Sequence, residues 1–84
     1  SFQNLNLFPN PANDNININL ISEQPVNATI NIYNSIGALL KTEQIGFNSG
    51  NNSHSVDLNN LNSGLFFIEI IGDNRKQNFK LIKN

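Results

Sequence analysis

Residues 15–20 read Asn15-Ile16-Asn17-Ile18-Asn19-Leu20, a strict alternation of polar and apolar side chains. Side chains along a β-strand point alternately to its two faces, so this run predicts a strand with one buried and one solvated face. Four further segments alternate in the same way. Their expected inward residues are Leu5 and Leu7; Ala28, Ile30 and Ile32; His54, Val56 and Leu58; and Phe79 and Leu81. Strands with one wet face are typical of antiparallel sheets.

The run Leu65-Phe66-Phe67-Ile68-Glu69-Ile70-Ile71 differs because it is apolar at nearly every position. Such a run predicts a strand in the centre of a sheet. Glu69 marks its own face as the wetter one, so we expect Phe66, Ile68 and Ile70 to point into the core. Residues 39–45 also favour a strand, but their pattern leaves the inward face open.

Turn-forming residues separate these runs at short intervals. Pro9-Asn10-Pro11 breaks strand pairing, because proline fixes φ and donates no backbone hydrogen bond. Residues 35–37 and residues 72–74 are expected to form two tight hairpin turns. Residues 46–52 are expected to form a longer polar loop, and residues 59–64 a crossover. We expect Leu61 in the crossover to tuck under the sheets. Seven short strands joined in this way predict an all-β fold, a seven-stranded antiparallel immunoglobulin-like β-sandwich with Greek-key connections.

Asparagine fills 19 of the 84 positions, whereas charged residues make up only 13% of the chain. Asparagine is poor in helix interiors and common at turns, because its side chain competes for nearby backbone groups. The composition therefore argues against a helical bundle. The length fits a single domain over residues 1–84 with one core. The chain has no cysteine, no initiator methionine and no signal-peptide pattern, so we expect a disulfide-free segment of a longer protein.

The formal net charge is −1, but the charges are unevenly placed. Four of the five basic residues lie in the last ten positions, at Arg75, Lys76, Lys80 and Lys83. No aromatic ladder interleaves with them as a nucleic-acid-binding surface requires, so we interpret them as solvated cations of an edge strand and expect no nucleic-acid partner. No run approaches the roughly 18 apolar residues of a membrane helix, so no membrane insertion is expected.

The titratable residues do not form the kind of cluster that catalysis needs. His54 is the only histidine, and its neighbouring serines point to the opposite face of the strand. The six carboxylates are scattered one per segment. Asp14 with Asn10 and Asn13 fits a capped turn better than a calcium loop. We therefore predict no catalytic residues, no metal and no cofactor.

Three motifs follow one another in order, and they are Phe8-Pro9-Asn10-Pro11-Ala12-Asn13-Asp14, Leu61-Asn62-Ser63-Gly64-Leu65-Phe66-Phe67-Ile68 and Phe79-Lys80-Leu81-Ile82-Lys83. A turn that ends in Gly37 lies between the first two. Together they resemble the type A C-terminal sorting domain of the Bacteroidetes type IX secretion system, also called the Por secretion system. The resemblance covers nearly the whole chain. It departs at Phe66, where the family usually has tyrosine, so the ring is kept and the hydroxyl is lost.

The resemblance implies a C-terminal secretion signal that directs an attached cargo protein across the outer membrane. It implies a cargo covalently linked on the N-terminal side, transit through the periplasm and recognition by the type IX translocon. Removal by a sortase-like peptidase at the outer membrane would leave the cargo at the cell surface or secreted. Two alternatives stay open: a carbohydrate-binding module that uses Tyr33 or Phe67, and a passive immunoglobulin-like spacer.

Under this interpretation the motif residues divide into two groups. We expect the first group to set the fold, and it comprises Pro9, Asn10, Pro11, Gly37, Leu61, Gly64 and Phe66. The second group is the candidate segment for translocon recognition, and it comprises Lys80, Leu81, Ile82 and Lys83. We expect this segment to be an edge strand that pairs with a partner by β-augmentation, with its basic charge steering it toward an acidic receptor surface.

Overall fold

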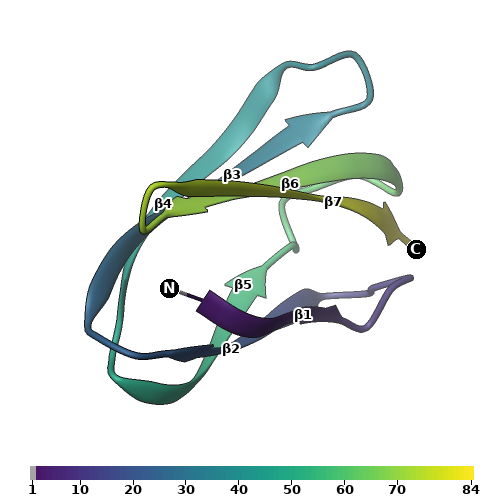
Figure 1. Ribbon diagram of the computed structural model, residues 1–84. Helices are drawn as coiled ribbons and strands as arrows, with labels where there is room; N and C mark the ends of the chain where they lie inside the picture. Colours follow the sequence, from purple (N-terminus) through teal and green to yellow (C-terminus); the bar gives the residue numbers. More distant parts are fainter. Residues whose placement is uncertain (1) are drawn as a thin grey trace.

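The computed structural model describes residues 2–84 and places them in seven strands. The strands are β1 (Phe2–Phe8), β2 (Asn15–Ser22), β3 (Val26–Asn34), β4 (Leu39–Phe47), β5 (Gly50–Asp57), β6 (Gly64–Gly72) and β7 (Arg75–Lys83). They form a three-stranded sheet in the order β1-β2-β5 and a four-stranded sheet in the order β4-β3-β6-β7 (Figure 1). All pairings between the strands are antiparallel. Within the described residues, no helix has the length and apolar character needed to cross a membrane.

The two sheets stack face to face as an immunoglobulin-like β-sandwich, which confirms the predicted fold class. The chain changes sheet three times, between β2 and β3, between β4 and β5, and between β5 and β6. The fourth strand pairs with β3, unlike in an immunoglobulin constant domain, where it belongs to the sheet of the first two strands.

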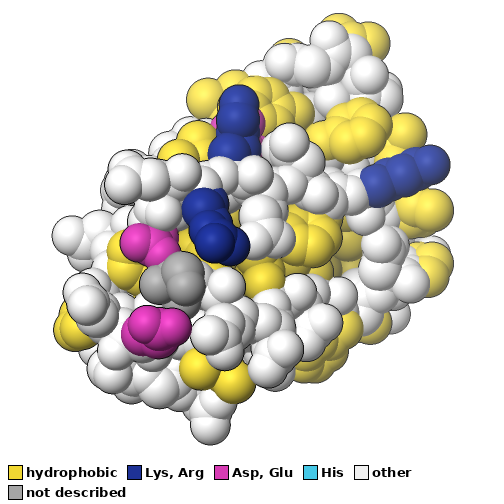
Figure 2. Space-filling model, viewed as in Figure 1, with side chains coloured by type: hydrophobic (Ala, Val, Ile, Leu, Met, Phe, Trp, Pro, Cys, Tyr) yellow, Lys and Arg dark blue, Asp and Glu magenta, His cyan; other side chains and the backbone are white. Residues whose placement is uncertain are grey.

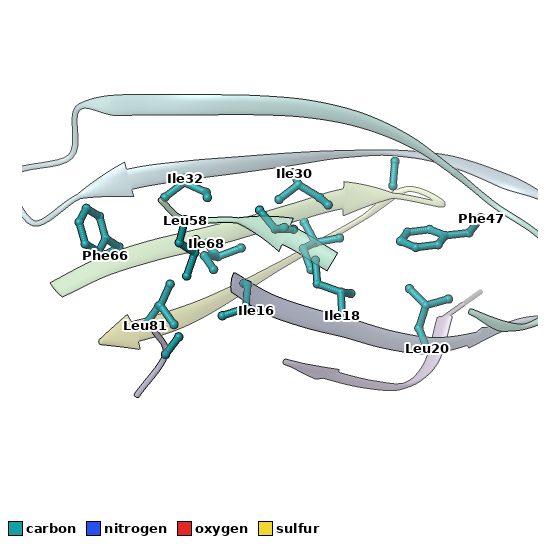
Figure 3. Close-up of a cluster of buried hydrophobic side chains, with 14 of the residues drawn as sticks. Ile16, Ile18, Leu20, Ile30, Ile32, Phe47, Leu58, Phe66, Ile68 and Leu81 are labelled. Carbon is teal, nitrogen blue, oxygen red and sulfur yellow. The ribbon is translucent and has the colours of Figure 1, made fainter. Parts of the chain in front are cut away.

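The core lies between the sheets, and most of its side chains are inward ones that the alternation predicts. Of the residues predicted to point inward, Leu5, Leu7, His54 and Phe79 are only partly buried, whereas Phe2, Ala12 and Phe47 are buried without having been predicted. Ile16, Ile18 and Leu20 from β2 face Ile68 and its neighbours from the opposite sheet (Figure 3). Within residues 2–84, the buried hydrophobic residues are Phe2, Ala12, Ile16, Ile18, Leu20, Ala28, Ile30, Ile32, Phe47, Val56, Leu58, Phe66, Ile68, Ile70 and Leu81. The assignment of the two faces of β6 is therefore confirmed.

The connection between β4 and β5 corrects one prediction. Residues 46–52, expected to be a long polar loop, belong mostly to these two strands, and only Asn48 and Ser49 lie between them. The Asn52 carboxamide makes this short turn possible, because its Nδ2 donates to the Asn48 carbonyl at 2.8 Å and its Oδ1 accepts from the Asn48 N–H at 2.9 Å. Phe47 is consequently buried and meets Phe2 edge-on, with ring centroids 5.7 Å apart.

The hairpin between β6 and β7 turns on two residues, as its sequence predicts. Asp73 and Asn74 have φ angles of 54° and 58°, the left-handed values that a two-residue type I′ turn requires. Gly72 is the last residue of β6 rather than part of the turn.

Gly72 lies where a side chain would be crowded. A Cβ at this position would be 3.1 Å from the Ala28 Cβ, 3.1 Å from the Phe2 ring and 3.2 Å from the Asn27 carbonyl oxygen. We expect Gly72→Ala to lower the free energy of unfolding by about 1–3 kcal/mol, as overpacking does. Gly46→Ala is the control, because its nearest neighbour would be the Asn27 Oδ1 at 3.6 Å. Urea unfolding followed by circular dichroism checks both, and equal losses would contradict the argument.

Candidate functional site

All the predicted motif residues lie at one end of the sandwich, on the right in Figure 1. We call this the motif end, and it consists of loop 9–14 between β1 and β2, turn 35–38, link 58–63 and residues 80–84. The strand register brings these segments together, because Gly64 pairs with Lys83 and Asn34 pairs with Phe66. Residues from four distant parts of the sequence thus form one surface.

Asn10 bonds the loop between β1 and β2 to the terminal strand β7. Its Nδ2 donates to the Lys80 carbonyl oxygen at 2.8 Å, and its Oδ1 accepts from the Ile82 N–H at 3.0 Å. A carboxamide presents one donor and one acceptor side by side, as a peptide group does. The Asn10 side chain therefore occupies the place of a neighbouring strand along this part of β7.

Ala12 continues the contact through its backbone. Its N–H donates to the Ile82 carbonyl at 2.8 Å, and its carbonyl accepts from the Asn84 N–H at 2.8 Å, which forms a parallel bridge with Lys83. The edge along Lys80–Lys83 is therefore not free for the predicted β-augmentation, because the Lys80 carbonyl, both backbone groups of Ile82 and the Asn84 N–H are already bonded. A partner strand would first have to displace loop 9–14.

The four candidate recognition side chains point in different directions. Leu81 is 2% exposed and lies in the core beside Ile16 and Ile68 (Figure 3). Lys80 and Ile82 are exposed on the outer face of the four-stranded sheet, and Lys83 is half-buried. Only Lys80, Ile82 and Lys83 can offer their side chains to a partner while the domain stays folded.

The second motif shapes the link between β5 and β6. Gly64 has a φ of 145°, a backbone angle that side chains with a Cβ rarely adopt. Leu61 packs against the core, and Phe66 is buried in it. Gly64, Leu61 and Phe66 line a hollow of about 610 Å³, together with Leu40 and Lys41 from β4. The Lys41 ammonium donates to the Asp57 carbonyl across this hollow at 2.8 Å.

The turn that contains Gly37 is organised by Asn34, a residue that the sequence interpretation did not single out. The Asn34 Oδ1 accepts from the Ile36 N–H at 3.1 Å and from the Ala38 N–H at 2.9 Å. Its backbone N–H donates to the Ala38 carbonyl at 2.9 Å, and the Gly37 N–H donates to the Asn34 carbonyl at 3.0 Å. An Asn at the start of a turn is a general signal for such bonding, which could have identified it.

Glu69 is the centre of a polar network on the outer face of the four-stranded sheet. Its Oε1 accepts from the Asn31 Nδ2 at 3.0 Å and from the Tyr33 hydroxyl at 2.9 Å, and its Oε2 lies 3.5 Å from the Lys76 ammonium. Thr42 extends the network by donating to the Asn31 Oδ1 at 2.9 Å. The Asn31 hydrogen bond, aided by Tyr33 and Lys76, lowers the pKa of Glu69 below its usual value. The bond to Glu69 raises the pKa of Tyr33.

The Glu69 network makes stability depend on pH. The folded-state pKa of Glu69 is below that of an unfolded chain, about 4.3, so its stabilisation is complete above that pH and is lost as the pH falls through the folded value. We expect the melting temperature to drop less between about pH 7 and about pH 3 in Glu69→Gln than in the unmodified chain. Glu23→Gln controls for the loss of one charge. An unchanged drop in Glu69→Gln would contradict this role.

His54 connects the two sheets. Its Nε2 lies 2.9 Å from the Glu43 Oε1, which joins β5 to β4. The neighbouring Ser55 hydroxyl accepts from the Asn15 Nδ2 at 2.8 Å. The amide of Asn13, considered above with Asp14 for calcium, bonds instead to the Asn84 side chain at 3.1 Å.

Comparison with known proteins adds one finding to this geometry. A protein-family model described as secretion system C-terminal sorting domain matches residues 6–84. The match includes the segments that make up the motif end. No curated protein matches the sequence.

Proposed function

Because this chain belongs to the family of secretion system C-terminal sorting domains, we propose that its motif end is the surface that the type IX translocon recognises. The domain is a C-terminal sorting signal for type IX secretion, and its attached cargo is exported across the outer membrane. This membership favours the sorting function over a carbohydrate-binding module or a passive spacer. The family is one of secretion signals, and we propose that residues 1–84 act as a single sorting domain without catalytic activity of their own.

The placement of the two chain ends carries the proposal. Phe2 begins β1 beside Gly72, whereas Lys83 ends β7 beside Gly64, so the two ends lie well apart, with the C-terminus at the right edge of Figure 1 and the N-terminus left of centre. A cargo linked on the N-terminal side therefore leaves the motif end unobstructed. The surface that contains the family motifs is also the one that a receptor can approach.

The exposed side chains of the terminal strand suit recognition by an acidic receptor. Lys80 and Ile82 present an exposed cation beside an aliphatic group, and the half-buried Lys83 adds a second cation at the end of the strand. The bonds from Asn10 and Ala12 fix the backbone that carries them. Complementary charge contributes mainly to association rate and specificity. We infer that a sortase-like peptidase at the outer membrane acts after the translocon, on a cargo that reached it through the periplasm.

An export assay tests this proposal. Residues 1–84 are fused to the C-terminus of a periplasmic reporter in a bacterium with a type IX system, and reporter in the medium is measured. We expect export of the unmodified fusion and a clear loss when Lys80 and Lys83 are both changed to Gln. The matched control changes Arg75 and Lys76 to Gln, at the other end of the same strand. Retention of the unmodified, folded fusion in the periplasm would contradict the sorting function, and equal export of both double variants would contradict the location of the site.

A further inference from the structure

The exposed hydrophobic residues of this molecule are concentrated on one sheet. Seven large hydrophobic side chains are exposed among the described residues, and six of them belong to the four-stranded sheet or to turn 35–38. These six are Ile36, Leu39, Leu40, Phe67, Ile71 and Ile82. In the upper part of Figure 2, where β3, β6 and β7 lie, hydrophobic side chains stand next to cationic ones. A surface of this kind on a soluble domain marks an interaction site.

The strand register places part of this set on one face, on both sides of the Glu69 network. Tyr33 of β3 lies opposite both Leu39 of β4 and Phe67 of β6, and Phe67 lies opposite Lys80 of β7. Directly opposite residues on one sheet face are within contact distance of each other. Further along the same face, Leu65 pairs with Ile82 and Ile71 pairs with Lys76. We call this group the outer-face patch, and it comprises Tyr33, Leu39, Leu65, Phe67, Ile71 and Ile82.

The other sheet shows what a merely solvated face looks like in this protein. On the outer face of the three-stranded sheet, Asn19 of β2 lies between Asn6 and Ser53, and Asn17 pairs with Ser55. These positions are polar and uncharged. Phe8, opposite Asn17, and Ile21 are the apolar exceptions on this face. The outer face of the three-stranded sheet is thus mainly polar, whereas most of the exposed large hydrophobic residues lie on the other sheet.

The charges beside the outer-face patch indicate the chemistry of its partner. Glu69 is the one carboxylate at the centre of this face, and Lys76 already pairs with it at 3.5 Å. Lys80, next to Phe67, adds positive charge at the β7 edge. Resting on the proposed function, we infer that the outer-face patch is a second docking surface for the export machinery, which meets it with an apolar protein surface that carries carboxylates beside β7.

The size of the face fits a contact that must later be released. All four strands of this sheet are nine residues long. Nine residues at about 3.3 Å and four strands at about 4.8 Å give a face of about 30 by 19 Å, or about 570 Å². An interface of this area on each partner lies at the small end of specific interfaces, among transient complexes. A cargo that passes through a translocon needs such a transient contact.

The same features disfavour a second copy of the chain as the occupant. In a symmetric dimer packed by this face, Lys76 and Lys80 of each copy would lie against the same face of the other copy, which carries the same cations. The only carboxylate at the centre of the face, Glu69, is already paired with Lys76 of its own chain. Like charges in such a contact repel each other, so an unlike, acidic partner fits better.

The test changes apolar groups of the outer-face patch without touching the lysines. The double variant Phe67→Thr and Ile71→Thr places threonine, a β-branched residue that strands favour, at both positions, and Leu39→Thr on the edge strand is a second, independent variant. The control is Ile21→Thr, which removes an aliphatic side chain from the opposite sheet. All are made in the reporter fusion, and circular dichroism of each purified chain confirms folding.

We expect about a tenfold loss of reporter export in the double variant, a smaller loss in Leu39→Thr, and export by Ile21→Thr close to that of the unmodified fusion. Unchanged export in folded patch variants, while the change of Lys80 and Lys83 to Gln still blocks export, would overturn this inference and leave the proposed function intact. Failure of the unmodified fusion to be exported would overturn both.

Two measurements on the isolated 84-residue chain separate other occupants. We expect light scattering to show a monomer and phosphatidylglycerol vesicles to leave the chain in the supernatant. A dimer that the double variant abolishes would assign the outer-face patch to a second copy and overturn the inference. Vesicle binding that the same variant abolishes would assign it to lipid and overturn it equally.

Discussion

Leu81→Ala is expected to lower the free energy of unfolding by about 2–5 kcal/mol, the usual cost of truncating a buried leucine. Leu81 is only 2% exposed and belongs to the single core cluster between the sheets. A chain of this length has about 4–13 kcal/mol of stability in total, so the variant should lose a large part of it. Urea unfolding measured by circular dichroism gives the value.

The neighbouring residue is the control for Leu81. Ile82 lies in the same strand, but its side chain is 45% exposed and points to the outer face. Its backbone bonds to Asn10 and Ala12 do not depend on the side chain. We expect Ile82→Ala to cost less than about 1 kcal/mol, as exposed substitutions do. A similar loss in both variants would contradict the assignment of Leu81 to the core and of Ile82 to the surface.

Asn10→Ala is expected to lower the free energy of unfolding by about 1–3 kcal/mol, because two hydrogen bonds to β7 are lost and each contributes about 0.5–1.5 kcal/mol. The loss should be local as well. Amide hydrogen exchange should accelerate at Ile82 and Asn84, whose N–H groups are bonded to Asn10 and Ala12.

Asn62→Ala is the matched control for Asn10→Ala, since it removes the same side chain from an exposed position in the link before β6. We expect it to change neither the stability nor the exchange at Ile82 and Asn84. If the amides of Ile82 and Asn84 exchange in Asn10→Ala at the same rate as in the unmodified chain, loop 9–14 does not hold the terminal strand.

The sequence was sufficient to predict most of the fold, because strand alternation is a local signal. The pattern around Ile16 and Ile18 identified both the strand and its buried face, and Glu69 distinguished the two faces of β6. The prediction was wrong at residues 46–52, where two glycines and several polar residues resemble a loop. The Asn52 amide closes a two-residue turn there, and a hydrogen bond of that kind leaves no mark in the hydrophobic pattern.

The candidate site was predicted only in part, because its organising contact is not local. The motifs named the right segments, but Asn10 and Ile82 are 72 positions apart, and nothing in either segment alone shows that they bond. Pro9 and Pro11 indicated a break in pairing, whereas the Asn10 side chain between them takes over the pairing of β7. For this reason the sequence suggested a free edge at Lys80–Lys83, and the structure shows an occupied one.

The central claim is that the motif end, held together by Asn10, is the surface that the translocon recognises. Recognition then depends on this surface and not only on the stability of the domain. Export of the reporter fusion by Asn10→Ala and by Gly72→Ala tests it most directly, because Gly72→Ala destabilises the opposite end of the same sandwich. Both are compared at a temperature where circular dichroism shows them folded. The claim predicts about a tenfold loss of export for Asn10→Ala and near-normal export for Gly72→Ala, a difference of about 1.4 kcal/mol in recognition. Equal export by the two variants would contradict it.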